Sequence, residues 1–150
     1  PRDYRNPAKG RVRNVVFDNL FVRGAGRCLI EGLPDRPTEN LVIRNLTWDV
    51  TGPCRTDEAV KPRGGRTELD PDRKHTYREP YQFVIVNARG LLMDRVRVHD
   101  RRPGGDGAAS DRGLLYLENL RDASIDAAGF PPPEGLEAVR QVDCRDVRMR

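Results

Sequence analysis

Basic and aromatic side chains that could hold an anionic ligand lie together in RGGRTELDPDRKHTYR, at residues 63–78. We predict a binding site for an acidic saccharide from Arg63, Arg66, Lys74, His75, Tyr77 and Arg78. Guanidinium groups bind carboxylates through paired hydrogen bonds, and a tyrosine ring offers a flat face to a sugar ring. Glu68, Asp70 and Asp72 lie among the basic residues. The alternative is therefore a charged loop that packs on the side of the fold or stays mobile.

Acid–base chemistry could come from four carboxylates: Asp18, Glu31, Asp94 and Glu118. Hydrolysis of a glycosidic bond with inversion needs a general acid and a base about 6.5–9.5 Å apart, and neighbouring segments of a repeated β structure could present such a pair. The alternative is a solvated or salt-bridged face, because 33% of the residues are charged. We predict no catalytic residue here and no hydrolase activity for the isolated chain.

The histidines and cysteines do not form a metal-binding pattern. His75 and His99 are the two histidines, and Cys28, Cys54 and Cys144 lie far apart with no CxxC spacing. No serine or cysteine stands beside a histidine as a nucleophile. We predict no metal site and no cofactor. Cys28 and Cys144 are expected to be small buried apolar residues and Cys54 a loop thiol, with one disulfide at most.

Composition indicates a single folded domain over residues 1–150. The chain has 27 basic and 23 acidic residues, and 37% of its residues are apolar. This near balance argues against disorder, which needs high net charge with low hydrophobicity. No run of 18 apolar residues could cross a bilayer. The net charge of +4 suits an anionic partner, either a nucleic acid or an acidic polysaccharide. One RGGR without aromatic platforms is a weak nucleic-acid signal.

A repeated pattern gives the clearest structural signal. Five segments place apolar residues at their second, fourth, seventh and ninth positions: 14–22, 40–48, 90–98, 122–130 and 141–149. On a helix these positions would point all round the axis, so a helical repeat is excluded. As β structure they form two short strands joined by a corner. Asn19 and Asn45 fall at that corner, where asparagine tolerates left-handed dihedral angles.

A second repeated block adds a third strand to each coil. It occurs at residues 26–33, 82–89, 112–120 and 134–139, and long loops are expected at residues 53–80 and 101–112. Stacked coils of this kind predict an all-β fold, a right-handed parallel β-helix of about five coils. The first coil would expose Val15, Phe17 and Leu20 together with a backbone edge. We therefore expect further coils before Pro1, in a longer parent protein.

Several stretches resemble a known family. VRNVVFDNLFV, CLIEGLPDRPTENLVIRNLTWDV, YREPYQFVIVNARGLLMDRVRV and LLYLENLRDASIDAAGF are similar to the C-terminal coils of bacterial glycoside hydrolase family 28, the polygalacturonase family of the pectin-lyase-like β-helix superfamily. The resemblance covers most of residues 11–149, and its most specific part lies at residues 32–45.

This resemblance implies a function. Members of glycoside hydrolase family 28 hydrolyse galacturonic acid chains with paired aspartates from Asn-Thr-Asp and Asp-Asp motifs, a Gly-His-Gly segment and an Arg-Ile-Lys segment. None of these motifs occurs in the chain. We expect the C-terminal part of a secreted, extracellular or periplasmic, hydrolase of pectin-type polysaccharide, with its catalytic coils upstream. The alternative is a non-catalytic β-helical segment for carbohydrate binding or adhesion.

Overall fold

A computed structural model describes residues 11–25, 27–52, 81–100, 113–130 and 137–150. The predicted long loops at 53–80 and 101–112 lie outside these residues. The described parts are all-β: β1 (Arg13–Gly24), β2 (Cys28–Glu31), β3 (Thr38–Val50), β4 (Tyr81–Asp100), β5 (Gly113–Ile125), β6 (Val139–Val142) and β7 (Arg145–Met149), with one 3-10 helix, η2 (Ala127–Gly129). No helix in the described ranges is long and apolar enough to cross a membrane.

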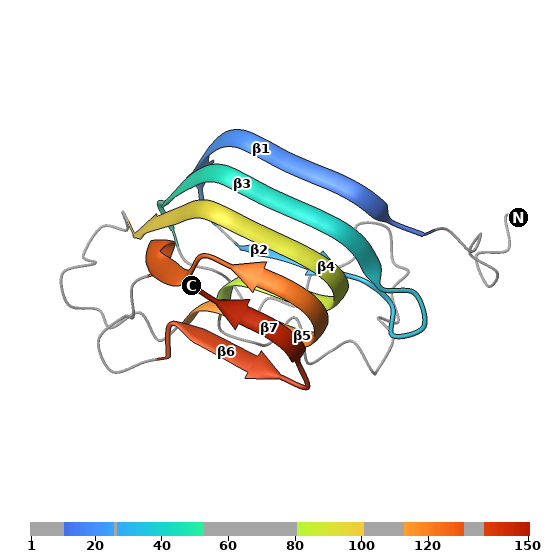
Figure 1. The fold of residues 1–150 in the computed structure, drawn as a ribbon. Coiled ribbons are helices and arrows are strands. Elements are labelled where there is room, and N and C mark those ends of the chain that lie inside the picture. The colour runs from blue at the N-terminus through green and yellow to red at the C-terminus, as the bar shows by residue number, and fades with distance from the viewer. Residues whose placement is uncertain (1–10, 26, 53–80, 101–112, 131–136) are drawn as a thin grey trace, which may run out of the picture.

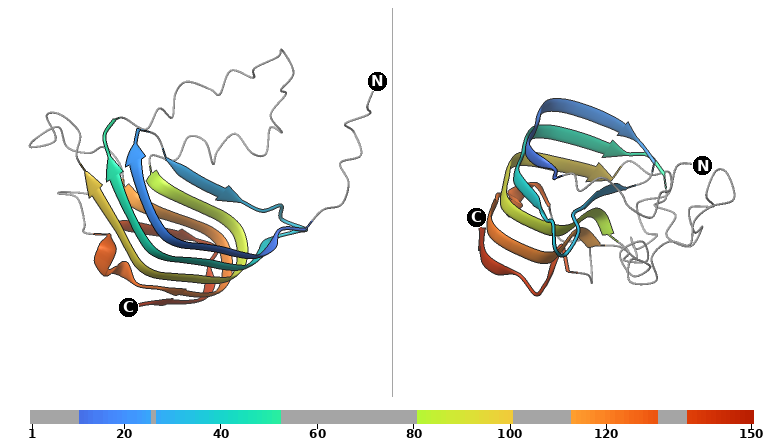
Figure 2. Two further views of the ribbon diagram at one scale, coloured as in Figure 1. Left: turned by 90° about the horizontal axis from the view of Figure 1, so that it is seen from above. Right: turned by 90° about the vertical axis from the view of Figure 1, so that its right-hand side faces the viewer.

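The strands form one sheet in which every named pair is parallel. Its order is β1-β3-β4-β5-β6, with β2 also paired to β4 and β7 to β5. Figure 1 shows β1, β3, β4 and β5 one below another. The long strands bend, so that the start of β4 lies with β2 on one side while its second half lies with β3 (Figure 2). Successive passes of the chain therefore repeat the same path.

The apolar core lies inside this bend and consists of in-register columns of side chains. Ile43 of β3, Met93 of β4 and Ile125 of β5 form one column and are at most 1% exposed. The ring of Trp48 packs edge-on against that of Phe83, with centroids 5.2 Å apart. Each such side chain contributes about 1.5–3 kcal/mol of burial free energy. The columns confirm that most of the alternating apolar positions face one core. Val142, also predicted to face inward, packs instead with a second buried cluster formed by Tyr81, Val84, Val86 and Tyr116.

The first strand leaves this core partly open. Phe17, Leu20 and Val22 of β1 are in register with buried residues of β3, yet they are 40%, 38% and 38% exposed. β1 pairs only with β3, so its second edge is free within the described sheet. The predicted exposure of this strand is confirmed for Phe17, Leu20 and the backbone edge, whereas Val15 is half-buried against the core.

Left-handed corners recur at the same level of successive strands. All described residues with positive φ fall into three rows: Asn14, Asn40, Gly90, Asp122 and Asp146; Asn19, Asn45 and Arg95; Asn87, Asn119 and Asp143. Asparagine and aspartate enter this region at low cost, because their short polar side chains bond locally. The predicted corner at Asn19 and Asn45 is confirmed, and the other two rows complete the bends.

The alignment of residues 141–149 was wrong, whereas residues 122–125 align with 90–93 as predicted. Residues 141–149 pair with 117–125, because Gln141 is in register with Leu117 and Met149 with Ile125, whereas the sequence pattern aligned them with 122–130. In the segment 122–130 the chain leaves the sheet after Ile125, and η2 replaces the second strand. Ala128, predicted to face inward, is consequently exposed. Gly129 allows this path, since a Cβ there would clash with the carbonyl of Val96.

Candidate polyanion-binding surface

The saccharide-binding residues predicted from sequence lie outside the described part of the chain. Arg63, Arg66, Lys74, His75, Tyr77 and Arg78 all fall within residues 53–80, as does Cys54. Their grouping stays a prediction. The candidate carboxylates, His99 and Cys28 lie in described strands, and Cys144 lies between β6 and β7.

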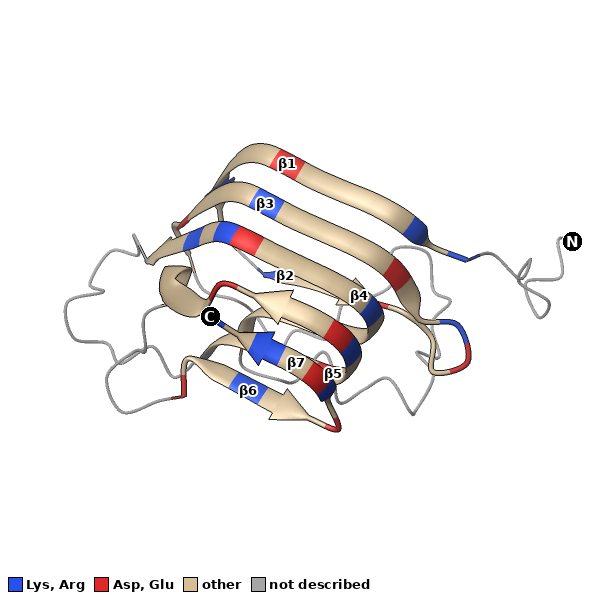
Figure 3. Cartoon of the chain, viewed as in Figure 1, with Lys and Arg blue, Asp and Glu red and all other residues tan. Residues whose placement is uncertain are grey.

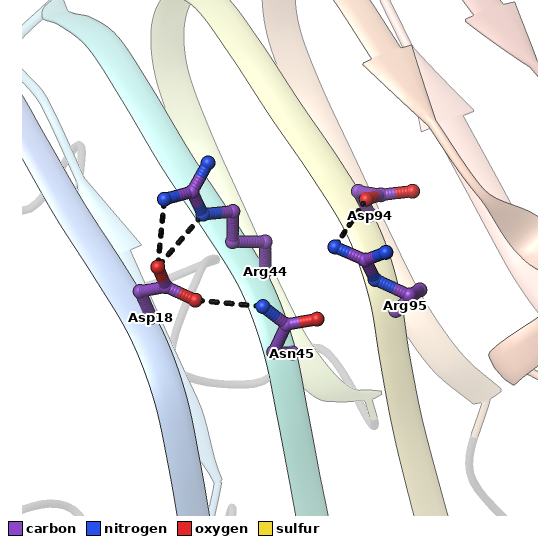
Figure 4. Close-up of polar contacts among 5 residues, drawn as sticks. All are labelled: Asp18, Arg44, Asn45, Asp94 and Arg95. Carbon is purple, nitrogen blue, oxygen red and sulfur yellow. Dashed lines mark hydrogen bonds and ion pairs between the residues drawn. The ribbon is translucent and has the colours of Figure 1, made fainter.

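Asp18 is held by two neighbours on β3. Its Oδ2 accepts from Nε of Arg44 at 2.9 Å and lies 2.7 Å from an Nη atom of the same guanidinium, while its Oδ1 accepts from Nδ2 of Asn45 at 2.8 Å (Figure 4). These bonds favour the carboxylate, so the hydrogen bond from Arg44, followed by that from Asn45, lowers the pKa of Asp18. The same contact raises the pKa of Arg44. A carboxyl group stabilised as its anion is poorly suited to act as a general acid.

Asp18 and Asp94 do not form a hydrolytic pair. They lie in register on either side of Arg44, with two strand spacings between their backbones, roughly 9.6 Å. That separation approaches the span of an inverting pair, but the guanidinium of Arg44 bonds to Asp18 in the intervening strand, where a water and a sugar would have to fit. Asp94 is also 3.4 Å from an Nη atom of Arg95.

The other two candidate carboxylates lie on the opposite side of the bend. Glu31 of β2 and Glu118 of β5 are both in register with Val86 of β4 and are half-buried. Tyr116 donates its hydroxyl hydrogen to Glu118 at 2.9 Å. Two strand spacings again separate the acidic residues, and an apolar valine lies between them. This arrangement supports a structural role for both glutamates.

His99 lies within β4, whereas the sequence pattern placed it beyond a strand. Its Nδ1 is 3.0 Å from Oδ1 of Asp49 on β3. Together with Arg95, Arg97 and Asp126 it lines a groove of about 360 Å³. The Asp126 carboxylate accepts from the backbone N–H of Ala128, so it serves as the cap of η2. The groove is basic, but Arg95 also contacts Asp94 as described above.

The described cysteines are structural. Cys28 and Cys144 are free thiols that pack against the core, as predicted, although each is only half-buried. Burial raises the pKa of the Cys28 thiol to about 11. Across the described ranges, no three His, Cys, Asp or Glu side chains form a group that could hold a metal ion.

An arginine row stands out on the outer surface. Arg89 of β4, Arg121 of β5 and Arg145 of β7 occupy one register position on three successive strands, and all three are exposed. None of them forms an ion pair within the described residues. Figure 3 shows this line of basic positions near one bend of the strands. Like charges on directly opposed strand positions are destabilising. At one end of the row this repulsion is reduced, because Glu39 of β3 is in register with Arg89. Between Arg121 and Arg145 an anionic ligand would reduce it.

A small pocket lies beside the upper part of the arginine row. It encloses about 190 Å³ and is lined by Arg89, Arg121, Asn119 and the turn that contains Pro34, Asp35 and Pro37. The carboxylate of Asp35 is paired with Nε of Arg36 at 3.1 Å. Asn119 donates through Nδ2 to Oδ1 of Asn87, which fixes the amide at the corner. The pocket therefore combines two guanidinium groups with a rigid backbone corner. Such a site can bind a carboxylate by paired hydrogen bonds.

The sequence reasoning missed the arginine row because its members are far apart in the chain. Each arginine directly precedes a corner residue, as in Arg89-Gly90, Arg121-Asp122 and Arg145-Asp146. Aligning the segments on their left-handed corners would have brought the three together. The incorrect alignment of residues 141–149 hid the third member.

Comparisons with known proteins assign neither a family nor a function to this chain. No protein-family model, curated protein or solved structure matches this chain.

Proposed function

We propose that this chain is a segment of a right-handed parallel β-helix that binds pectin-type, galacturonic acid-containing polysaccharide along the arginine row. The observation that carries the proposal is the stacking of three exposed arginines at one register position. Strand spacing sets their backbones about 4.8 Å apart, or roughly 9.6 Å from first to last. A polymer with a carboxylate on each sugar can contact several of them at once.

The charges elsewhere on the described surface favour binding over catalysis. Asp18 is neutralised by Arg44, and Glu118 is bonded to Tyr116. In the described sheet, Arg44 lies between Asp18 and Asp94, and Val86 lies between Glu118 and Glu31. The net charge of +4 also favours an anionic ligand. The proposed role is therefore to hold the polysaccharide rather than to cleave it.

The resemblance to glycoside hydrolase family 28 supplies the galacturonate part of the proposal. It also extends the proposal to a parent hydrolase of the extracellular or periplasmic space, in which this segment would guide the substrate. The parallel pairing and the three corner rows support a β-helix. For the isolated chain we expect no release of reducing sugar from polygalacturonate.

Calorimetric titration of oligogalacturonate into the chain at low salt tests this proposal. Removing one of three arginines should cost about 1–1.5 kcal/mol, so Arg121→Ala should weaken binding by about tenfold. Arg140→Ala is the matched control, because Arg140 is equally exposed but lies on β6 outside the row. It should leave the affinity unchanged.

Three results would count against the proposal. Equal losses in Arg121→Ala and Arg140→Ala would show that only net charge matters. If the chain bound a single-stranded RNA of equal charge more tightly than oligogalacturonate, the ligand would be a nucleic acid rather than a polysaccharide. If a chain with a β-rich circular dichroism spectrum did not bind oligogalacturonate, this polysaccharide would be excluded as a ligand.

A further inference from the structure

The groove between β4 and η2 is separate from the arginine row. The pairing of β5 with β4 ends at Ile125 and Met93, and η2 then lies beside the end of β4 (Figure 1). The groove encloses about 360 Å³. Its lining consists of residues 95–99 of β4 together with Asp126, Ala128 and Gly129. Both of its walls are formed by elements inside the sheet, neither of which is the first or the last strand.

The groove presents one unpaired guanidinium group. Arg97 is exposed, and within the described residues it forms no ion pair. Its in-register neighbour on β3 is the uncharged Thr47. A guanidinium group donates in a planar fork that matches the two oxygens of a carboxylate. One Nη atom of Arg95 lies 3.4 Å from Asp94 (Figure 4), and its guanidinium keeps further N–H donors for a ligand.

An acidic side chain limits the charge of the ligand. Asp126 lines the same groove, and its carboxylate accepts from the backbone N–H of Ala128 at 3.1 Å. A ligand with two negative charges would be repelled by this carboxylate more strongly than a ligand with one. A phosphate monoester carries a charge of about −1.5 to −2 at pH 7. The groove therefore favours a carboxylate as its anion.

His99 provides a place for a hydroxyl group. Its Nδ1 lies 3.0 Å from Oδ1 of Asp49 on β3. Because a carboxylate only accepts, Nδ1 carries the hydrogen of this bond, and Nε2 is left for a ligand. A neutral ring accepts at Nε2, whereas a protonated ring donates there. A hydroxyl group suits both forms, since it can donate and accept.

The backbone of Val98 adds a donor at the same place. The carbonyl of Val96 faces η2, since a Cβ at Gly129 would clash with it. Residues two apart on a strand direct their backbone groups to the same edge, so Val98 faces this edge as well. No described strand pairs with β4 there, because its pairing with β5 ends at Met93. The N–H of Val98 can therefore bond to a ligand in the groove.

We propose that this groove binds one sugar acid, with its carboxylate held by Arg97 and the N–H of Val98 and a hydroxyl group held by His99. The volume of the groove lies at the lower end of the range for small-molecule sites, which suits a single sugar residue rather than a polymer. The carboxylate and the hydroxyl group follow from the groove, and the choice of a uronic acid rests on the proposed function. The groove is a second site, distinct from the arginine row.

Heteronuclear NMR titration of the isotope-labelled whole chain with D-galacturonate, at low salt, tests this site. The amide signals of residues 95–99 should shift. Arg97→Ala should weaken binding by about tenfold or more and spare the fold, because Arg97 is exposed and unpaired. Arg140→Ala, at an exposed position of β6, is the matched control and should leave the affinity unchanged. Galactose, which lacks the carboxylate, should bind about tenfold more weakly than galacturonate.

His99→Phe separates the hydroxyl contact from the carboxylate contact. It keeps a ring and removes both nitrogen atoms, so it should weaken galacturonate binding by about fivefold. Binding of acetate, which has no hydroxyl group, should not change. Equal galacturonate affinities of His99→Phe and the wild-type chain would overturn the proposal. Tighter binding of inorganic phosphate than of galacturonate would also overturn it, because the groove would then select for charge alone.

A variant with Arg89, Arg121 and Arg145 replaced by alanine distinguishes this proposal from the proposed function. It should keep the wild-type affinity for D-galacturonate, since none of these residues lines the groove. Loss of galacturonate binding in this variant, or an unchanged affinity of Arg97→Ala, would overturn the groove site. If the wild-type chain bound D-galacturonate in the groove but did not bind oligogalacturonate, the groove site would stand and the proposed function would fail.

Discussion

Asn87 is a corner residue that is buried, has a left-handed backbone conformation and forms two side-chain hydrogen bonds. It is 7% exposed and has φ of 54°. Its Nδ2 donates to the carbonyl of Gly32 at 2.9 Å, and its Oδ1 accepts from Nδ2 of Asn119 at 2.6 Å. The side chain therefore ties the corner of β4 to the strands on both sides. Replacing it tests whether these polar corners stabilise the fold.

The cost of Asn87→Ala follows from two contributions. Two hydrogen bonds are lost, each worth about 0.5–1.5 kcal/mol net. The left-handed dihedral costs roughly 1–2 kcal/mol for an alanine. We expect a loss of about 3–4 kcal/mol in the free energy of unfolding. Asn87→Gly loses the same bonds but adopts the dihedral freely, so it should lose about 2–3 kcal/mol, including the backbone entropy of glycine.

Urea unfolding followed by far-UV circular dichroism measures both values. Gln141→Ala, at an exposed position of β6, is the control and should change stability by no more than about 0.5 kcal/mol. The reasoning fails if Asn87→Gly is as damaging as Asn87→Ala. It also fails if Asn87→Ala costs less than about 1 kcal/mol, because the corner bonds would then contribute nothing measurable.

Three further predictions concern single groups. The hydrogen bonds from Arg44 and Asn45 lower the pKa of Asp18 below its ordinary value of 3.8, so the stabilisation from its carboxylate is present above that value and is lost as pH falls through the folded-state pKa. Asp18→Asn should therefore lower the urea midpoint at pH 7, and the difference from wild type should shrink as the pH falls below 3.8. With its pKa raised from 9.0 to about 11, Cys28 should react with a disulfide reagent at pH 8 about 100-fold more slowly in the folded than in the unfolded chain, in a variant whose other cysteines are serine. Gly32→Ala should destabilise by about 1–3 kcal/mol, since its Cβ would clash with backbone atoms of Asn87 and Thr38, while Gly24→Ala, with no atom within 4 Å, should be near neutral by the same urea assay.

The all-β architecture with parallel strands was predictable from the core-facing residues. Leu41, Ile43, Leu46 and Trp48 alternate, stop at the corner and resume, and all four are buried. This pattern is local, and it follows from the two-residue period of strands. The parallel pairing agrees with this repetition, because successive passes of the chain along the same path bring like residues to the same level.

The corner rows explain where the sequence analysis failed. Asn14 and Asn19 are five residues apart, whereas Asn87 and Gly90, like Asp143 and Asp146, are three apart. Both kinds of corner are flanked by alternating apolar residues, so apolar pattern alone cannot distinguish them. The segment 141–149 contains the three-residue spacing and was aligned to segments with the five-residue spacing.

The arginine row could not be predicted without that alignment. Its residues belong to three strands and meet only because the corners bring them to the same level. Asp18 and Arg44 show the same dependence on register: one lies 26 residues before the other, and their ion pair follows from the pairing of β1 with β3. Surface chemistry in this fold is therefore a property of strand register rather than of local motifs.

The salt dependence of oligogalacturonate binding tests the central claim most directly. The wild-type chain should lose affinity steeply as salt rises, because several ionic contacts form along the arginine row. A variant with Arg89, Arg121 and Arg145 all replaced by alanine should bind weakly and show a nearly flat dependence. If that folded variant keeps the wild-type affinity and salt slope, the row is not the binding surface.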